Sequence, residues 1–131
     1  MVSVFVDTSA LYALLDGDDA GHERAMRGSE RILGEELLTH SNVIVETVSL
    51  VRRRLGAEAA MRLIDEVLPA IKVVDVDAAL RGRAMAAYRA AVSSAVSLVD
   101  RTSFEFMRAL AISEAWALDA DFETEGFKLV S

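Results

Sequence analysis

The stretch that decides the fold is Val2-Ser3-Val4-Phe5-Val6-Asp7-Thr8-Ser9 at the start of the chain. Residues 2–6 are mostly β-branched or aromatic, which is typical of a strand buried inside a sheet. Asp7 is the first charged side chain and stands where this strand ends. Ligands of open α/β sheets bind beyond the carboxyl ends of the strands, so Asp7 is predicted to face an active site.

Apolar segments alternate with helical segments along the rest of the chain. Strands are expected at residues 37–39, 71–74, 114–118 and 127–130, and helices at residues 8–15, 19–33, 42–55, 57–68, 77–91 and 98–112. Thr8 or Ser9 is expected to cap the first helix, and residues 119–126 are expected to form a turn-rich loop. The alternation predicts a single domain over residues 1–131, with a parallel sheet that carries helices on both faces.

The composition favours a soluble cytoplasmic domain without membrane contact. Hydrophobic residues make up 53% of the chain, too many for a disordered segment, and charged residues interrupt every apolar run before it could span a bilayer. The sequence enters the expected first strand without a basic region or a small-residue cleavage site, so secretion is not expected. The absence of cysteine excludes disulfides and thiolate metal sites.

The formal net charge of −7 argues on its own against a nucleic-acid-binding surface. This inference can fail locally, because carboxylates that gather around divalent cations are neutralised when the cations bind. The acidic residues in unusual surroundings therefore carry the most information about function.

Two carboxylates lie within strongly apolar segments. Glu46 interrupts residues 43–51, the most apolar stretch of the chain, where a buried charge would need compensation. Asp100 interrupts residues 96–104 in the same way. Each has a structural alternative: Glu46 could be a first-turn glutamate on an exposed helix face, and Asp100 could form a capping box with Ser97.

Two aspartates follow the expected strand at residues 114–118. Asp119 stands after this strand as Asp7 stands after the first, and Asp121 comes two residues later. Aspartates are common turn residues, so each alone has an ordinary explanation. Taken with the other carboxylates, they are explained more economically by one acidic site at the edge of a parallel sheet.

Such a site has a defined chemistry. Clustered carboxylates either raise each other's pKa or bind a cation, and Mg²⁺ and Mn²⁺ prefer oxygen ligands. Two such ions about 3.5–4 Å apart can activate a water for attack on a phosphodiester. No nucleophilic side chain is needed. His22 and His40 are distant in sequence from the carboxylates, and both are expected at the surface or in turns.

Four segments of the chain carry a family resemblance. They are residues 4–11, the embedded Glu46, residues 98–104, and Asp119-Ala120-Asp121-Phe122 followed by Gly126-Phe127. In order and spacing they resemble the PIN-domain ribonucleases, and within them the VapC-type toxins. The resemblance covers essentially the whole chain. It implies a three-layer α/β/α sandwich around a central parallel sheet, and Mg²⁺- or Mn²⁺-dependent endoribonuclease activity.

The resemblance also implies roles for the acidic residues. Asp7, Glu46, Asp100 and Asp119 match the family's catalytic acidic quartet, and Asp121 matches its more variable fifth acidic position. By this match Asp7 and Asp100 would be the main direct metal ligands. The other three acids would bind metal directly or through water.

The residues around the first and last aspartates add detail to this match. Thr8 and Ser9 match hydroxyl positions, where a hydroxyl or a backbone amide could orient Asp7 or contact the substrate phosphate; helix capping is the alternative. Ala117 departs from the family, because many members have threonine or serine two residues before the third aspartate. The missing hydroxyl could weaken support for Asp119 without removing a metal ligand.

The expected partners follow from the same resemblance. VapC-type toxins are typically homodimers and are inhibited by a cognate antitoxin, so an RNA substrate, an antitoxin and a second copy of the chain are expected. The acidic net charge fits a basic inhibitory segment. Arg24, Arg27 and Arg31 recur at helical spacing, which fits either an RNA-binding stripe or a solvated helix face.

Two rival functions remain open beside a metal-dependent endoribonuclease that acts as the toxin of a VapBC-type pair. A catalytically weak PIN domain would act as an RNA- or protein-binding module. A phosphoacceptor signalling domain also uses an aspartate at a strand end, but that class needs an acidic pair beside it. Asp7 has no acidic neighbour in sequence, which disfavours the second rival.

Overall fold

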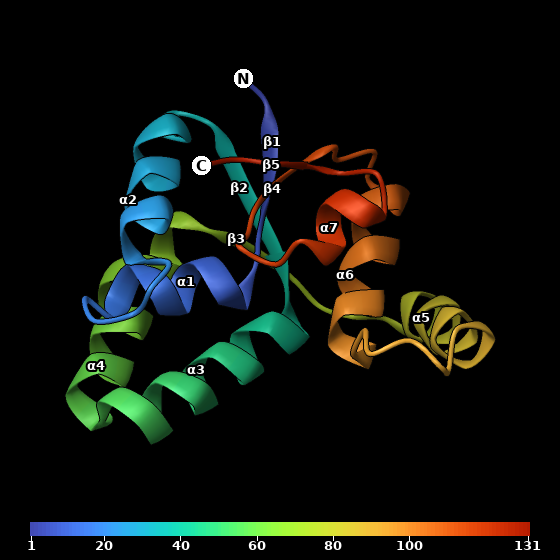
Figure 1. Cartoon of the computed structure of the whole chain (residues 1–131), viewed down its shortest axis with the longest axis horizontal. Coiled ribbons are helices and arrows are strands. Elements are labelled where there is room, and N and C mark those ends of the chain that lie inside the picture. Colours follow the sequence, from blue (N-terminus) through green and yellow to red (C-terminus); the bar gives the residue numbers. More distant parts are fainter.

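The centre of the molecule is a five-stranded parallel sheet in the order β3-β2-β1-β4-β5 (Figure 1). The computed structural model describes all of residues 1–131. The strands are β1 (Ser3–Val6), β2 (Glu36–His40), β3 (Lys72–Val74), β4 (Glu114–Trp116) and β5 (Lys128–Leu129). Because every pair is parallel, the carboxyl ends of all five strands meet at one edge of the sheet.

The first strand lies in the middle of the sheet, as its apolar sequence predicts. Val4, Phe5 and Val6 are at most 2% exposed, and they pack between helices on both faces. β1 pairs with β2 on one side and with β4 on the other. The strand that ends at Asp7 is therefore next to the strand that leads to Asp119.

Helices cover both faces of the sheet and make the expected three-layer α/β/α sandwich. Figure 1 shows α1 to α4 on one side of the strands and α5 to α7 on the other. The helices are α1 (Thr8–Leu15), α2 (His22–Arg31), α3 (Ser41–Leu55), α4 (Ala57–Arg62), α5 (Ala78–Ala90), α6 (Leu98–Ala109) and α7 (Asp121–Thr124). None of them is long and apolar enough to cross a membrane.

Several expected boundaries are wrong, and each has a local cause. The expected helix at 57–68 leaves the α-helical pattern after Arg62, where a π-helical turn (Leu63–Val67) and a 3₁₀ turn (Leu68–Ala70) around Pro69 follow. The expected helix at 19–33 begins only at His22, because the Asp19 side chain accepts a hydrogen bond from the Gly21 amide and holds a turn.

The segment 119–126 is also more regular than expected. It contains the short helix α7, which begins at Asp121. The helix is preceded by an Asx turn, in which Asp119 Oδ1 accepts a hydrogen bond from the Asp121 amide at 2.9 Å. Phe122 is fully buried beneath it and packs edge-on against Phe104 of α6, with 4.9 Å between the ring centroids. Long-range burial therefore orders a segment whose local sequence reads as a loop.

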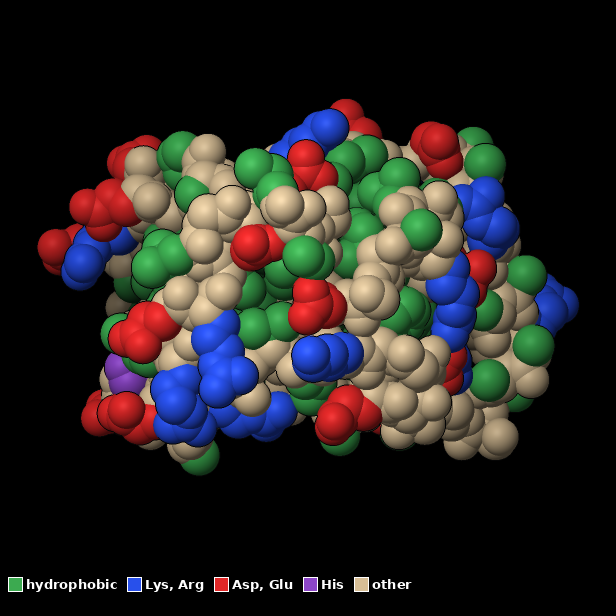
Figure 2. Space-filling view, turned by 90° about the horizontal axis from the view of Figure 1, so that it is seen from above, with side chains coloured by type: hydrophobic (Ala, Val, Ile, Leu, Met, Phe, Trp, Pro, Cys, Tyr) green, Lys and Arg blue, Asp and Glu red, His purple; other side chains and the backbone are tan.

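Helix α2 lies directly against β4. The Trp116 indole N–H donates to the Ala25 carbonyl at 3.1 Å, and a Cβ added to Gly28 would lie only 2.6 Å from the Trp116 ring. A glycine is required at this position because α2 and the sheet approach each other too closely for a side chain. The outer face of α2 is basic, and Figure 2 shows Lys and Arg side chains gathered on the side of the molecule where α2 lies in Figure 1.

Candidate active site

Asp7 is buried at the carboxyl end of β1 and caps the helix that follows. Its side chain is the N-cap of α1, with Oδ2 accepting hydrogen bonds from the Ser9 amide at 3.1 Å and the Ser9 hydroxyl at 2.6 Å. The expectation that Thr8 or Ser9 caps α1 is therefore wrong. Burial raises the pKa of Asp7 to about 6, against the lowering effect of the Ser9 bonds, and Glu46 and Asp119 raise it further by repulsion.

The Ser9 hydroxyl connects the ends of the two central strands. It donates to Asp7 and accepts a hydrogen bond from the Leu118 amide at 2.9 Å. Leu118 immediately precedes Asp119, so one hydroxyl fixes the separation between two of the predicted site carboxylates. Thr8 plays a different part, because its buried hydroxyl is 2.8 Å from that of Thr47 on α3.

Asp100 lies in the first turn of α6 and faces the other carboxylates. Ser97 caps this helix by accepting a hydrogen bond from the Asp100 amide at 3.1 Å. The Ser97 cap that the sequence offered as an alternative role for this segment is therefore confirmed. Capping does not account for the Asp100 carboxylate, which is half-buried. Burial raises its pKa to about 7, and repulsion from Asp7, Asp119 and Glu46 adds to the shift.

Asp119 and Asp121 complete a tight group with Asp100. One carboxylate oxygen from each of the three residues can be chosen so that all lie within 4.8 Å of one another. Burial, followed by repulsion from Asp119, raises the pKa of Asp121. Asp121 was expected to be the more variable member of the set, yet it belongs to this closest group.

Glu46 stands on α3 at the rim of the same region and is exposed. The helix begins at Ser41, so Glu46 lies in its second turn, and the first-turn alternative is wrong. The alternative that it is exposed is confirmed. Its charge nevertheless raises the pKa of both Asp7 and Asp100, which places it on the site side of the helix.

The arrangement fits a divalent cation. None of the five carboxylates takes part in an ion pair with a lysine, arginine or histidine. All of the donors are oxygens, as Mg²⁺ and Mn²⁺ prefer, and the negative charges are held close enough to raise one another's pKa. A bound cation would replace this repulsion by attraction.

His40 is not at the surface, which corrects the expectation from sequence. It ends β2 with no exposed area, and its ring stacks on Phe5 with 5.8 Å between the centroids. Its Nε2 is 2.9 Å from the Ser103 hydroxyl of α6, and burial lowers its pKa to about 4. His40 is therefore a neutral core residue beneath the site. His22, the other histidine, begins α2 and is partly exposed.

An arginine network next to the site was missed by the sequence reasoning. Arg101, the residue after Asp100, is 11% exposed in its side chain, and its Nη1 lies 3.4 Å from Glu125 Oε2. Arg108 binds the other oxygen of Glu125 at 2.9 Å. Glu125 is the C-cap of α7, which begins at Asp121. The network thus holds α7 on α6 and positions Asp121 next to Asp100. The Asp-Arg pair at 100–101 was the only local signal for it.

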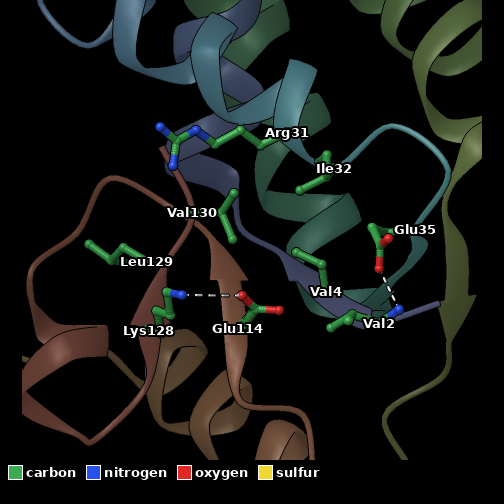
Figure 3. Close-up of a pocket in the computed structure, with 9 residues that line it drawn as sticks. All are labelled: Val2, Val4, Arg31, Ile32, Glu35, Glu114, Lys128, Leu129 and Val130. Atoms are coloured by element: carbon green, nitrogen blue, oxygen red, sulfur yellow. Dashed lines mark hydrogen bonds and ion pairs between the residues drawn. The ribbon is translucent and has the colours of Figure 1, made fainter.

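The opposite edge of the sheet has a pocket of about 170 Å³ that differs in character (Figure 3). Both of its glutamates have partners there: Glu114 lies 3.9 Å from Lys128 Nζ, and Glu35 accepts a hydrogen bond from the Val2 amide. Unlike the carboxyl edge, this pocket does not gather unpaired carboxylates.

Comparisons with known proteins show which proteins this chain resembles. The family model described as PIN domain matches residues 4–127. The chain is 36% identical over 131 residues to the 23S rRNA-specific endonuclease VapC20 of Mycobacterium tuberculosis, covering 95% of each sequence. The crystal structure of that Sarcin-Ricin loop cleaving toxin superposes with a TM-score of 0.83 at 34% identity, over 95% of both chains.

More distant structures share the fold. FitAcB from Neisseria gonorrhoeae matches with a TM-score of 0.72 at 14% identity, over 98% of this chain and 96% of that one. VapBC2 from Rickettsia felis matches with a TM-score of 0.71 at 13% identity, over 98% and 97%. The family match over most of the sequence and the VapC20 similarity lead to one conclusion: the chain belongs to the PIN-domain family.

Proposed function

We propose that the chain is a metal-dependent endoribonuclease that hydrolyses RNA phosphodiester bonds and acts as the toxin of a VapBC-type toxin–antitoxin pair. The observation that carries the proposal is the meeting of Asp100, Asp119 and Asp121 within 4.8 Å beside the buried Asp7. The 36% identity to an endonuclease toxin over 95% of the chain supports it. Because that relative is specific for 23S rRNA, ribosomal RNA is the first substrate to test.

The site residues divide the work between holding the cation and shaping the site. Asp7, Asp100, Asp119 and Asp121 hold Mg²⁺ or Mn²⁺, and Glu46 acts from the rim, where it is free to orient a water. A bound cation supplies charge stabilisation at the phosphate and lowers the pKa of the attacking water. Ser9 keeps the Asp7 carboxylate oriented, through the hydrogen bonds at 2.6 and 3.1 Å.

The hydroxyls that follow Asp7 differ in what they can do for a substrate. Ser9 is partly exposed, and we propose that its hydroxyl turns from Asp7 to the phosphate once the cation holds that carboxylate, while its amide stays on Asp7. Thr8 is buried and its hydroxyl is taken by Thr47, so its contribution is the packing of α1 against α3. Ala117 is fully buried and offers no hydroxyl to Asp119. Ser9 instead holds the backbone next to Asp119, through the hydrogen bond from the Leu118 amide.

The proposed partners extend beyond RNA. We propose a cytoplasmic homodimer that a cognate antitoxin inhibits. Apolar side chains exposed on α3, α4 and the following turn support a second copy: Val45 is 67% exposed, Met61 56% and Ile64 43%. The net charge of −7 suits a basic inhibitory segment.

The test is to map RNA ends in cells after a brief induction of the chain, with Asp7→Asn as the control. We expect new RNA ends and growth arrest with the unchanged chain and neither with the variant. Purified protein should cleave RNA with Mg²⁺ or Mn²⁺ and stop when a chelator is added. RNA cleavage that persists in Asp7→Asn would contradict the metal mechanism. RNA binding without any cleavage would instead support the rival function of a catalytically weak binding module.

A further inference from the structure

Three arginines form one stripe on the outer face of α2. Arg24, Arg27 and Arg31 are separated by three and four residues, which places them on the same side of the helix over about 10 Å. Arg27 and Arg31 are exposed and Arg24 is partly exposed. We call these three residues the α2 stripe. The sequence alone left its role open between RNA binding and a solvated face.

The charges of the α2 stripe are not neutralised by the protein. None of the three arginines forms an ion pair, although Glu23 and Glu30 lie on the same helix. Figure 3 shows the Arg31 side chain on the rim of the pocket, directed away from Glu35 and Glu114. In a chain of net charge −7, three adjacent unpaired cations mark a surface that suits an anionic partner.

The α2 stripe runs between the two edges of the sheet. Gly21, the N-cap of α2, lies so close to Leu118 that an added Cβ would overlap the Leu118 side chain. Leu118 precedes Asp119, and its amide is held by Ser9. Arg24 is in the first turn of α2, at this end of the helix, and Arg31 lines the pocket at the opposite edge of the sheet. The stripe therefore points toward the edge that carries the carboxylates.

We propose that Arg24, Arg27 and Arg31 bind successive phosphates of the RNA strand whose scissile bond lies at the carboxylate site. This inference rests on the proposed function. RNA suits the stripe because its charges repeat along the strand, and arginine forks bind phosphate oxygens in pairs. The contact adds affinity and direction to substrate binding and takes no part in the chemical step.

The test measures the binding of a short fluorescein-labelled single-stranded RNA to the full chain that carries Asp7→Asn, so that cleavage is blocked. The α2 triple variant is Arg24→Gln, Arg27→Gln and Arg31→Gln. The matched control is Arg81→Gln, Arg83→Gln and Arg89→Gln on α5, where three other exposed arginines also lack ion pairs. Both variants change the net charge equally.

We expect the α2 triple variant to lose affinity by at least about tenfold and the control to stay within about twofold. Between about 50 and 200 mM salt, the slope of log K against log salt should fall by about 2, the value for three lost contacts to single-stranded RNA. The triple Arg→Lys variant should keep the slope. With Asp7 restored, the α2 triple variant should raise KM and leave kcat unchanged.

Each contrary result has a distinct meaning. Equal losses in the two variants would show that net charge, rather than this face, governs binding, and would overturn the inference. A polyglutamate peptide serves as a probe for an acidic protein partner. If the α2 triple variant loses binding to this peptide but still binds RNA, the stripe belongs to an acidic protein, and the inference is overturned. If the α2 triple variant cleaves RNA with an unchanged KM, the inference fails and the proposed function stands. If the unchanged chain neither binds nor cleaves RNA, both fail.

Discussion

The two edges of the central sheet both carry carboxylates, but at the carboxyl edge these carboxylates gather and raise one another's pKa. At the amino edge Glu35 accepts from the Val2 amide, Glu36 accepts from the Ser3 hydroxyl at 2.8 Å, and Glu114 lies near Lys128. At the carboxyl edge the carboxylates face one another, and none forms an ion pair.

The difference separates acidic residues that pair with the surrounding chain from acidic residues that gather and repel one another. A carboxylate that accepts a hydrogen bond or pairs with a lysine contributes a little to stability, typically less than about 1 kcal/mol at the surface. Carboxylates that repel each other destabilise the fold, and groups with strongly shifted pKa values collect at functional sites. Asp7 and Asp100, with pKa values raised to about 6 and about 7, belong to the second class.

The largest expected effect separates the two edges directly. Asp100→Asn should weaken Mn²⁺ binding, measured by titration calorimetry, by more than about 100-fold, because losing a ligand exceeds the 10–100-fold typical of losing a supporting group. RNA cleavage should fall in parallel. The matched change at the amino edge, Glu114→Gln, should leave both within about twofold. Equal losses in the two variants would break the distinction between the edges.

A smaller effect should separate the two arginines that hold Glu125. Arg101→Ala removes the less exposed partner next to Asp100 and should lower Mn²⁺ affinity and cleavage by about tenfold, since α7 and Asp121 lose their fixed position. Arg108→Ala removes the partner that is 45% exposed and should change either value by no more than about threefold. If Arg108→Ala had a larger effect than Arg101→Ala, α7 would be held mainly by the arginine at the C-terminal end of α6.

The smallest effect concerns stability in the absence of metal. The raised pKa of Asp7 means that the folded state binds its proton more tightly than the unfolded state, so this residue lowers stability as pH rises from about 4 to about 6. Asp7→Asn should therefore raise the free energy of unfolding at pH 8 by about 3 kcal/mol. At about pH 3, where the carboxyl is protonated in both states, the difference should largely vanish. Urea unfolding at the two pH values, with chelator present, checks this, and a variant less stable at pH 8 would contradict it.

The sequence predicted the sheet and the candidate acids because their signals are local. The run from Val2 to Val6 is apolar enough to identify a central strand, and Asp7 and Asp119 each stand one to three residues beyond a strand end. Parallel pairing then brings strand ends together without further information. For this reason the three-layer sandwich was predicted correctly.

Other features depend on contacts between distant parts of the chain. Nothing near His40 in sequence reveals that Ser103 and Phe5 surround it. The helix at Asp121 forms because Phe122 finds a buried place against Phe104, and Arg101 finds Glu125 across 24 positions of sequence. Such contacts are set by packing in three dimensions, which hydrophobic periodicity does not encode.

The strand order β3-β2-β1-β4-β5 also governs when the site can exist. Asp7 directly follows β1, whereas Asp119 and Asp121 come more than a hundred residues later in the chain. A nascent chain can fold β1 against β2 early, but it lacks one side of the acidic site until β4 and the residues after it have been made. The ribosome that makes the protein therefore holds an incomplete site while the residues between Asp7 and Asp119 are added.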